Sequence, residues 1–114
     1  MKIPKDGYLL RVFLGEGDKW HGKPLYEALF MKARELHLAG ATVLRGPMGF
    51  GAKSHLHTAK LLRISEDLPI IIEIVDSKEN LDRLMPYIDE MVQDGLVTLE
   101  PVHVIRYGAT KNGA

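Results

Sequence analysis

Apolar stretches along the chain predict a series of β-strands. Residues 8–14 are largely apolar on both alternating faces, which is typical of a central strand covered on both sides. Residues 41–45 form a second strand pattern. Strand character resumes at 59–64, pauses, and is strongest over 70–75, and a final strand is predicted over 96–107.

Two intervening segments have the spacing of amphipathic helices. The first is predicted to begin at Pro24, which suits the first helical position, and Gly40 is a good residue just beyond its end. The second is predicted to be capped by Asp76, with Glu79 three residues later as in a capping box. Gly95 closes this second helix.

The resulting order, βαββαβ, predicts an α+β fold of the ferredoxin-like type with a four-stranded antiparallel sheet. In this arrangement the first and third strands lie side by side in the centre of the sheet. Arg11 and Glu73 are each the only charge within these two strands. Because buried charges are costly unless they are paired, we expect them to form a cross-strand pair on the face away from the helices.

Two helices can cover only one face of such a sheet, yet the other face is predicted to be apolar as well. Leu9, Phe13, Ile71 and Val75 fall on that second face. A lone monomer would expose this patch, which soluble monomers avoid. We therefore expect the chain to form a homo-oligomer, of cyclic symmetry, through the open face of the sheet.

Length and composition narrow the function classes. With 114 residues the chain fits a single domain, 1–114, in which 108–114 reads as a flexible tail. Fifteen basic and fifteen acidic residues cancel, so no broad field attracts nucleic acid, and we expect no nucleic-acid partner. The absence of cysteine excludes disulfides, thiol nucleophiles and cysteine-ligated zinc. No apolar run is long enough to span a membrane, and we expect a cytoplasmic protein.

A glycine-rich segment between the second and third strands is the strongest candidate for a binding site. Glycines let backbone N–H groups approach a ligand closely, and such groups bind phosphate well. The segment also carries positive or proton-linked side chains, and its candidate ligand-binding residues are Arg45, Gly46, Gly49, Phe50, Gly51, Lys53 and His55. A hairpin whose glycines only permit turns is the alternative, with about equal weight.

Two histidines in the same segment allow a metal-site interpretation. In an extended chain His55 and His57 point the same way, so both could hold zinc or copper. Glu66 or Asp67 is the nearest source of a third ligand. Solvated loop histidines remain the alternative interpretation, and it is the favoured one.

Two other places carry candidate chemistry. The loop after the first strand holds Trp20, the only tryptophan, which could stack on a base or pack against a neighbouring subunit. Arg106 and Tyr107, near the end of the final strand, could reach a phosphate or extend along the surface. No catalytic triad or metalloprotease motif occurs, and neither Asn80 nor Asn112 suits acylphosphatase-like chemistry, so we do not expect an enzyme.

Three runs of sequence closely resemble the family called domain of unknown function 190, which is described as PII-like. They are LLRVFLGEGDKWHGKPLYEAL, LAGATVLRGPMGFGAKSHLHTAKLLRISEDLPIIIEIVD and MPYIDEMVQDGLVTLEPVHVIRY. The resemblance covers roughly residues 7–108. It implies a ferredoxin-like fold, a homotrimer, and adenine-nucleotide binding in the clefts between subunits.

The resemblance also assigns roles to particular residues. The T-loop, through which PII proteins engage transporters or enzymes, corresponds to 46–58, so Gly49, Phe50, Gly51 and Lys53 carry over as residues close to the ligand. Arg106 takes the place of the carboxyl-terminal arginine that reaches the nucleotide phosphates of a neighbouring subunit.

The sequence departs from the PII pattern in three respects. The loop is short and lacks the tyrosine that is modified in PII proteins, and the phosphate loop before the last strand is reduced to Gln-Asp-Gly without its lysine. These departures favour AMP or ADP over ATP with magnesium. The related CutA proteins share the fold and the trimer and are linked to divalent metals, so the alternative is a metal-binding trimer that uses His55 and His57.

Overall fold

Four strands form the central sheet of the computed structural model, which describes residues 6–50, 57–58 and 68–108. Their order across the sheet is β4 (Thr42–Arg45), β7 (Pro69–Asp76), β1 (Asp6–Gly15) and β8 (Leu96–His103). All three neighbouring pairs are antiparallel, and the first and third strand patterns are the central strands β1 and β7. The predicted ferredoxin-like α+β fold is therefore confirmed.

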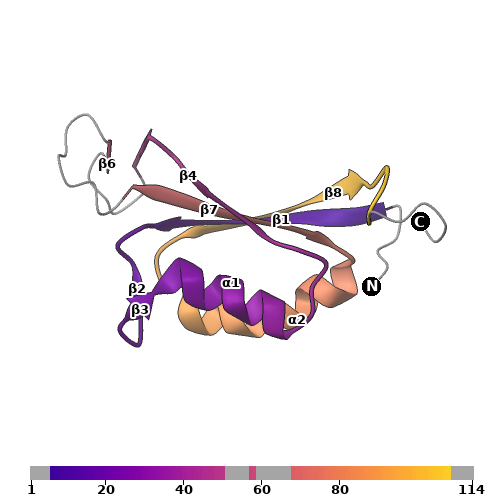
Figure 1. The fold of residues 1–114 in the computed structure, drawn as a ribbon, viewed down its shortest axis with the longest axis horizontal. Helices are drawn as coiled ribbons and strands as arrows, with labels where there is room; N and C mark the ends of the chain where they lie inside the picture. Colours follow the sequence, from indigo (N-terminus) through magenta and orange to yellow (C-terminus); the bar gives the residue numbers. More distant parts are fainter. Residues whose placement is uncertain (1–5, 51–56, 59–67, 109–114) are drawn as a thin grey trace.

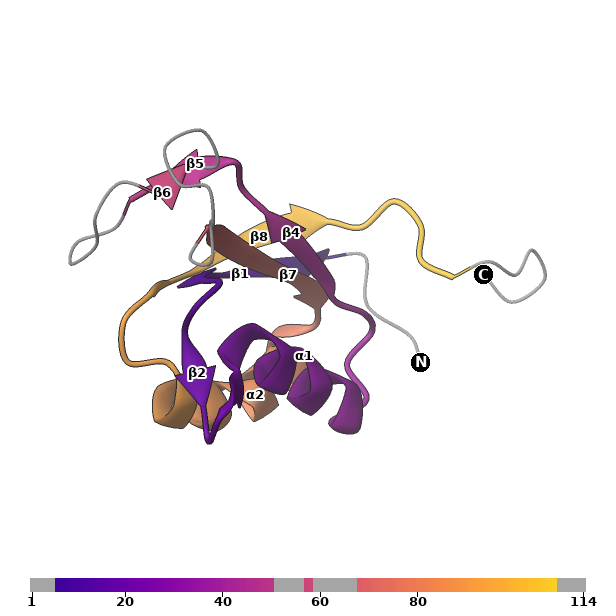
Figure 2. The ribbon, with the colours of Figure 1, turned by 60° about the vertical axis from the view of Figure 1, so that its left-hand side comes forward.

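Helices α1 (Leu25–Glu35) and α2 (Lys78–Met91) both pack on one face of this sheet (Figures 1 and 2). Alternate residues of the two central strands point to that face because side chains on a strand have a period of two. They form the buried core together with the apolar stripes of the helices. Its fully buried large apolar members are Leu10, Val12, Leu29, Ile70, Ile72, Ile74, Leu81 and Leu84.

Two short hairpins lie outside the main sheet. One joins β2 (Lys19–Trp20) to β3 (Lys23–Pro24) through His21 and Gly22, whose φ angles are 51° and 82°. Positive φ at both central residues matches the type I′ turn that suits two-residue hairpins. The other hairpin pairs β5 (Met48–Gly49) with β6 (His57–Thr58), beyond the end of β4 (Figure 2). The strand predicted over 59–64 lies outside the described residues.

Both helices differ from the prediction at their ends. Ser77, not Asp76, caps α2, and its hydroxyl accepts a hydrogen bond of 3.1 Å from the Asn80 N–H. Asp76 is instead the last residue of β7, opposite Tyr8, and its side chain is fully buried. The pairing with β1 holds Asp76 in the sheet, so the cap falls one residue later.

Helix α1 ends earlier than Gly40. His37 lies just beyond the helix in the left-handed conformation, with φ 61°. The Leu38 N–H donates to the Ala33 carbonyl at 3.1 Å and the His37 N–H to the Arg34 carbonyl at 3.0 Å. These two bonds are those of a Schellman motif, so His37 occupies the position predicted for glycine.

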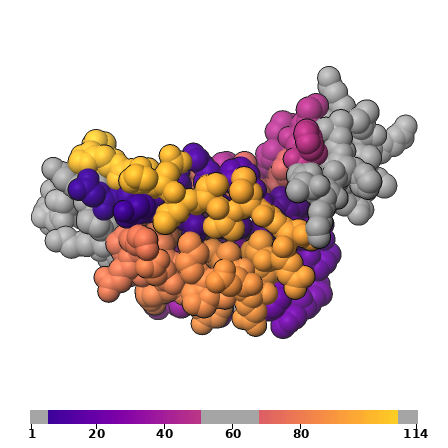
Figure 3. Space-filling model, turned by 180° about the vertical axis from the view of Figure 1, so that it is seen from behind, coloured from indigo at the N-terminus to yellow at the C-terminus, as the bar shows by residue number. Residues whose placement is uncertain are grey.

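The last strand is shorter than predicted. β8 ends at His103, opposite Asp6, and residues 104–107 turn away across the end of the sheet. Figure 3 shows β8 along one side of the molecule, beside α2, as expected of an edge strand. Gly95 does not close α2, which ends at Met91; a Cβ at Gly95 would lie 2.8 Å from the Phe13 carbonyl oxygen. Among the described residues, neither helix is long and apolar enough to cross a membrane.

Candidate functional site

The sheet face opposite the helices is mostly apolar, as predicted. Register places side chains of the four strands in rows across this face, and one row consists of Leu44, Ile71, Phe13 and Leu96. Leu44 and Leu96 are 43% and 55% exposed. No helix in the described part of the chain covers these rows (Figure 1). We call this surface the open face.

The next row across the open face is polar, and it contains the predicted ion pair. Arg11 lies directly opposite Glu73, and its Nε donates to Glu73 Oε2 at 3.0 Å. Its Nη1 also donates to Glu100 Oε1 at 2.8 Å, a second partner that was not predicted. The hydrogen bond to Glu73 raises the pKa of Arg11 above its ordinary value, although burial acts in the opposite direction. Arg11 is therefore charged at any physiological pH.

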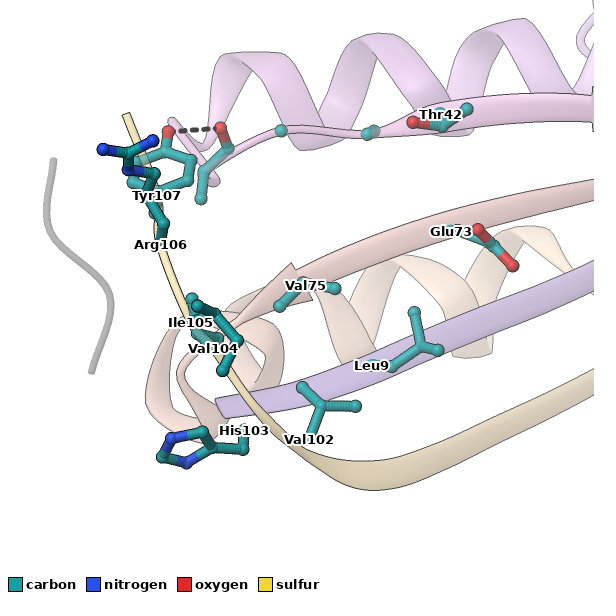
Figure 4. A pocket seen from close by; sticks show the side chains of 13 residues that line it. Leu9, Thr42, Glu73, Val75, Val102, His103, Val104, Ile105, Arg106 and Tyr107 are labelled. Carbon is teal, nitrogen blue, oxygen red and sulfur yellow. Dashed lines mark hydrogen bonds between the residues drawn. The ribbon is translucent and has the colours of Figure 1, made fainter. Parts of the chain in front are cut away.

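A groove of about 690 Å³ lies at one end of the open face. Its floor includes Leu9 and Val75, with the carboxylate of Glu73 and the hydroxyl of Thr42 farther along the sheet (Figure 4). Residues 103–107 form one wall because they run across the strand ends instead of continuing β8. The volume falls within the usual range of small-molecule sites, roughly 300 to 1,000 Å³.

One hydrogen bond fastens this wall to the opposite side of the groove. The Tyr107 hydroxyl donates to the Ala39 carbonyl at 2.6 Å, between the C-terminal segment and the connection from α1 to β4. The Ala39 N–H in turn donates to Asp76 Oδ2 at 2.8 Å. From its place near the strand end, Tyr107 was expected to reach a phosphate or extend along the surface, and its bond to Ala39 was not predicted. A contact between residues 68 positions apart leaves no periodic signal in the sequence.

Arg106 lies at the rim of the groove, next to Tyr107. Its side chain is exposed and points out of the groove rather than over Leu9 and Val75 (Figure 4). No carboxylate among the residues that the structure describes pairs with it. Arg106 can therefore receive an anion that approaches from outside the subunit.

The described part of the glycine-rich segment lies at the other end of the sheet. Arg45, the last residue of β4, forms an ion pair with Glu16, so its charge is already compensated within the chain. The Gly46 N–H donates to the Pro69 carbonyl at 2.8 Å. A Cβ at either Gly46 or Gly49 would lie 3.0 Å from Cγ of Pro69, so both glycines permit close packing on this ring. Phe50 is 76% exposed.

The structure thus separates the predicted site residues into two groups within one chain. Arg45 in β4 pairs with Ile70 in β7, and Ile70 pairs with Leu14 near the end of β1. Arg106 comes three residues after His103, which pairs with Asp6 at the start of β1. The span from Asp6 to Leu14 alone is roughly 26 Å along β1. Gly51, Lys53 and His55 lie outside the described residues. A small ligand cannot contact both groups in the same subunit.

The metal interpretation concerns residues that the structure mostly does not describe. His55, Glu66 and Asp67 lie outside the described residues, and His57 is placed only as part of the backbone of β6. In residues 6–50 and 68–108, no three His, Asp or Glu side chains come close enough together to hold a metal ion. A metal site at His55 and His57 remains a hypothesis.

A family model described as "Uncharacterized ACR", the DUF190 family, matches residues 7–104. The chain belongs to this family. A UPF0166 protein from Aquifex aeolicus is 39% identical over 97 residues, which cover 85% of this chain and 91% of the relative. The resemblance deduced from the loop and strand motifs is therefore confirmed.

Solved structures similar to this DUF190 chain are PII-like. CPII, a nitrogen regulatory PII-like protein from Thiomonas intermedia bound to ADP, AMP and bicarbonate, has a TM-score of 0.64 and 18% identity, with 89% of this chain and 90% of CPII covered. A putative PII-like signalling protein from Thermus thermophilus has a TM-score of 0.65 and 16% identity, with coverage of 88% and 90%. At these identities the likeness shows the fold.

Proposed function

We propose that this protein is a non-enzymatic PII-like regulator that binds AMP or ADP in clefts between the subunits of a homotrimer. The observation that carries this proposal is the groove on the open face, with Arg106 at its rim and no carboxylate partner for this arginine in the described part of the chain. The similar protein CPII was crystallised with ADP and AMP. The apolar floor at Leu9 and Val75 suits a base or sugar, and Arg106 suits a phosphate.

The separation of the candidate residues supports a site shared between subunits. Arg106 and the glycine turn at Gly46 and Gly49 lie at opposite ends of one sheet. In a cyclic assembly, one end of each subunit can meet the other end of its neighbour. The outward direction of the Arg106 side chain fits such a role (Figure 4). Arg45 is paired with Glu16, whereas Arg106 has no carboxylate partner among residues 6–50 and 68–108.

Regulation requires that the nucleotide favour one state of the 46–58 loop over another. Ligand contacts made in only one loop state shift the population toward that state, and a ligand with equal affinity for both states would signal nothing. We infer that this loop is the surface that engages a membrane transporter or an enzyme. The exposed Phe50 and Met48, at 76% and 57%, are apolar side chains that a partner could cover.

The proposal is tested by isothermal titration of the purified protein with AMP, ADP and ATP. We expect AMP or ADP to bind, and Arg106→Ala to raise the dissociation constant by a factor of about 10 to 100, the range for a lost hydrogen bond to a charged group. Arg83→Ala is the matched control because Arg83 is an exposed arginine on α2, which packs on the covered face of the sheet.

Two results would contradict these expectations. Absence of binding heat with all three nucleotides would remove the nucleotide proposal. Binding by Arg106→Ala with the affinity of the Arg83→Ala control would show that Arg106 does not contact the phosphates, and would leave the groove without its proposed anion site.

A further inference from the structure

The peptide groups at Ala39 are held from two sides. The Ala39 N–H donates to Asp76 Oδ2 at 2.8 Å, and the Ala39 carbonyl accepts from the Tyr107 hydroxyl at 2.6 Å. Ala39 therefore links a residue of the core to a residue of the C-terminal segment. Figure 4 shows the second of these bonds across the upper end of the groove.

The Asp76 side of this link is rigid. Its carboxylate is fully buried and also accepts hydrogen bonds from the Ser77 N–H at 2.7 Å and from Asn80 Nδ2 at 3.0 Å. Three donors from two parts of the chain fix the carboxylate at the start of α2. Ala39 is thus a fixed point to which another segment can attach.

The Tyr107 side has little else to hold it. Residues 104–107 are not part of a strand, and Ile105 is 85% exposed. No other hydrogen bond joins Ile105, Arg106 or Tyr107 to the residues that the structure describes. Without the bond from Tyr107, the backbone on either side of Arg106 would lose its only polar attachment to that part of the chain.

We propose that Tyr107 is a positioning residue that fixes Arg106 at the rim of the groove for an anionic ligand. Tyr107 acts through the backbone because the bond to Ala39 restrains the residue next to Arg106. A restrained arginine loses less conformational entropy when it binds a phosphate, which raises affinity. The ligand part of this inference rests on the proposed nucleotide function, whereas the restraint does not require a ligand.

The test uses Tyr107→Phe, which removes the donor and keeps the ring. In ¹⁵N relaxation of the ligand-free protein, we expect backbone order parameters at residues 105–107 to fall from about 0.85 to below about 0.6. In titration with ADP we expect the dissociation constant to rise about threefold to tenfold, as for one lost neutral hydrogen bond. In an Arg106→Ala background the same substitution should change the affinity no further.

Tyr26→Phe is the matched control because Tyr26 is a half-buried tyrosine of α1, away from the groove, and we expect it to leave both measurements unchanged. Unchanged order parameters in Tyr107→Phe would overturn the proposal. The proposal would also be overturned if Tyr107→Phe weakened ADP binding by the same factor in the wild-type protein and in the Arg106→Ala variant. If the wild-type protein bound no nucleotide, the proposed function would fail, and the order parameters alone would decide the restraint.

Discussion

His37 ends helix α1 in a backbone conformation that residues other than glycine seldom adopt. Its φ of 61° places the side chain close to the following carbonyl, which costs roughly 1 kcal/mol or more in an L-residue. The Schellman bonds from His37 and Leu38 need this conformation, so the helix end imposes it. Gly40, three residues later, has no such constraint, and a Cβ there would meet nothing within 4 Å.

We therefore expect His37→Gly to raise the free energy of unfolding by about 0.5 to 1 kcal/mol, since the relief of strain exceeds the added entropy of the unfolded chain. Gly40→Ala is the comparison and should leave stability unchanged or slightly raised. Urea denaturation at equal protein concentrations measures both. A loss of about 1 kcal/mol in Gly40→Ala, with no gain in His37→Gly, would mean that Gly40 is the residue that ends the helix.

At the scale of elements, Asp76 joins three parts of the fold. Its buried carboxylate lies at the end of β7, accepts from Asn80 in α2, and accepts from Ala39 in the connection before β4. Each donor is a polar group that needs a partner when it is withdrawn from water. The geometry of the α1–β4 connection therefore depends on the Asp76 side chain. The wall of the groove depends on it as well, because Tyr107 attaches that wall to Ala39.

Replacing Asp76 with alanine should destabilise the protein by about 3 kcal/mol, because several buried donors lose their acceptor at once. Asp82→Ala is the control: Asp82 is an exposed residue of α2 that pairs with Lys78 at 3.2 Å, and its loss should cost less than about 0.5 kcal/mol. Denaturation midpoints by circular dichroism compare the two. Similar losses in both variants would show that the Asp76 bonds contribute no more than a surface pair.

The sequence predicted the elements and the central pairing well, because both depend on local patterns. The alternation along β1 and β7 determined which residues face the helices, and the opposed charges of Arg11 and Glu73 identified their register. The cap of α2 was wrong by one residue since Asp76 and Ser77 are both good caps, and only the pairing with Tyr8 distinguishes them. The bond from Tyr107 to Ala39 depends on tertiary contact alone.

The candidate site was less predictable than the fold for a related reason. Arg106 and the glycine segment were each recognisable from sequence, but their separation along the sheet follows from register. β8 was predicted to continue to residue 107, and that prediction hid the groove, which exists because the chain turns at residue 104. Beyond the turn, the bond from Tyr107 to Ala39 attaches the segment to a residue that is distant in the sequence, and local patterns do not reveal such a contact.

For the whole molecule, the open face is the feature that a single chain leaves incomplete. Its apolar row from Leu44 to Leu96 is partly exposed, while the polar row at Arg11 is already paired within the chain. Burying such a row between copies would remove apolar surface from water without leaving those charges unpartnered. The proposed trimer would also bring together the two groups of candidate site residues.

Leu44→Glu should therefore reduce the mass in light scattering from that of a trimer to that of a monomer, because three carboxylates would be buried in the assembly. Met31→Glu is the matched control, since Met31 on α1 is 46% exposed against 43% for Leu44 but lies on the helical side. Leu44→Glu should also bind ADP weakly although Arg106 is intact, because the site needs a neighbour. A monomer that binds ADP with wild-type affinity would place the whole site within one chain.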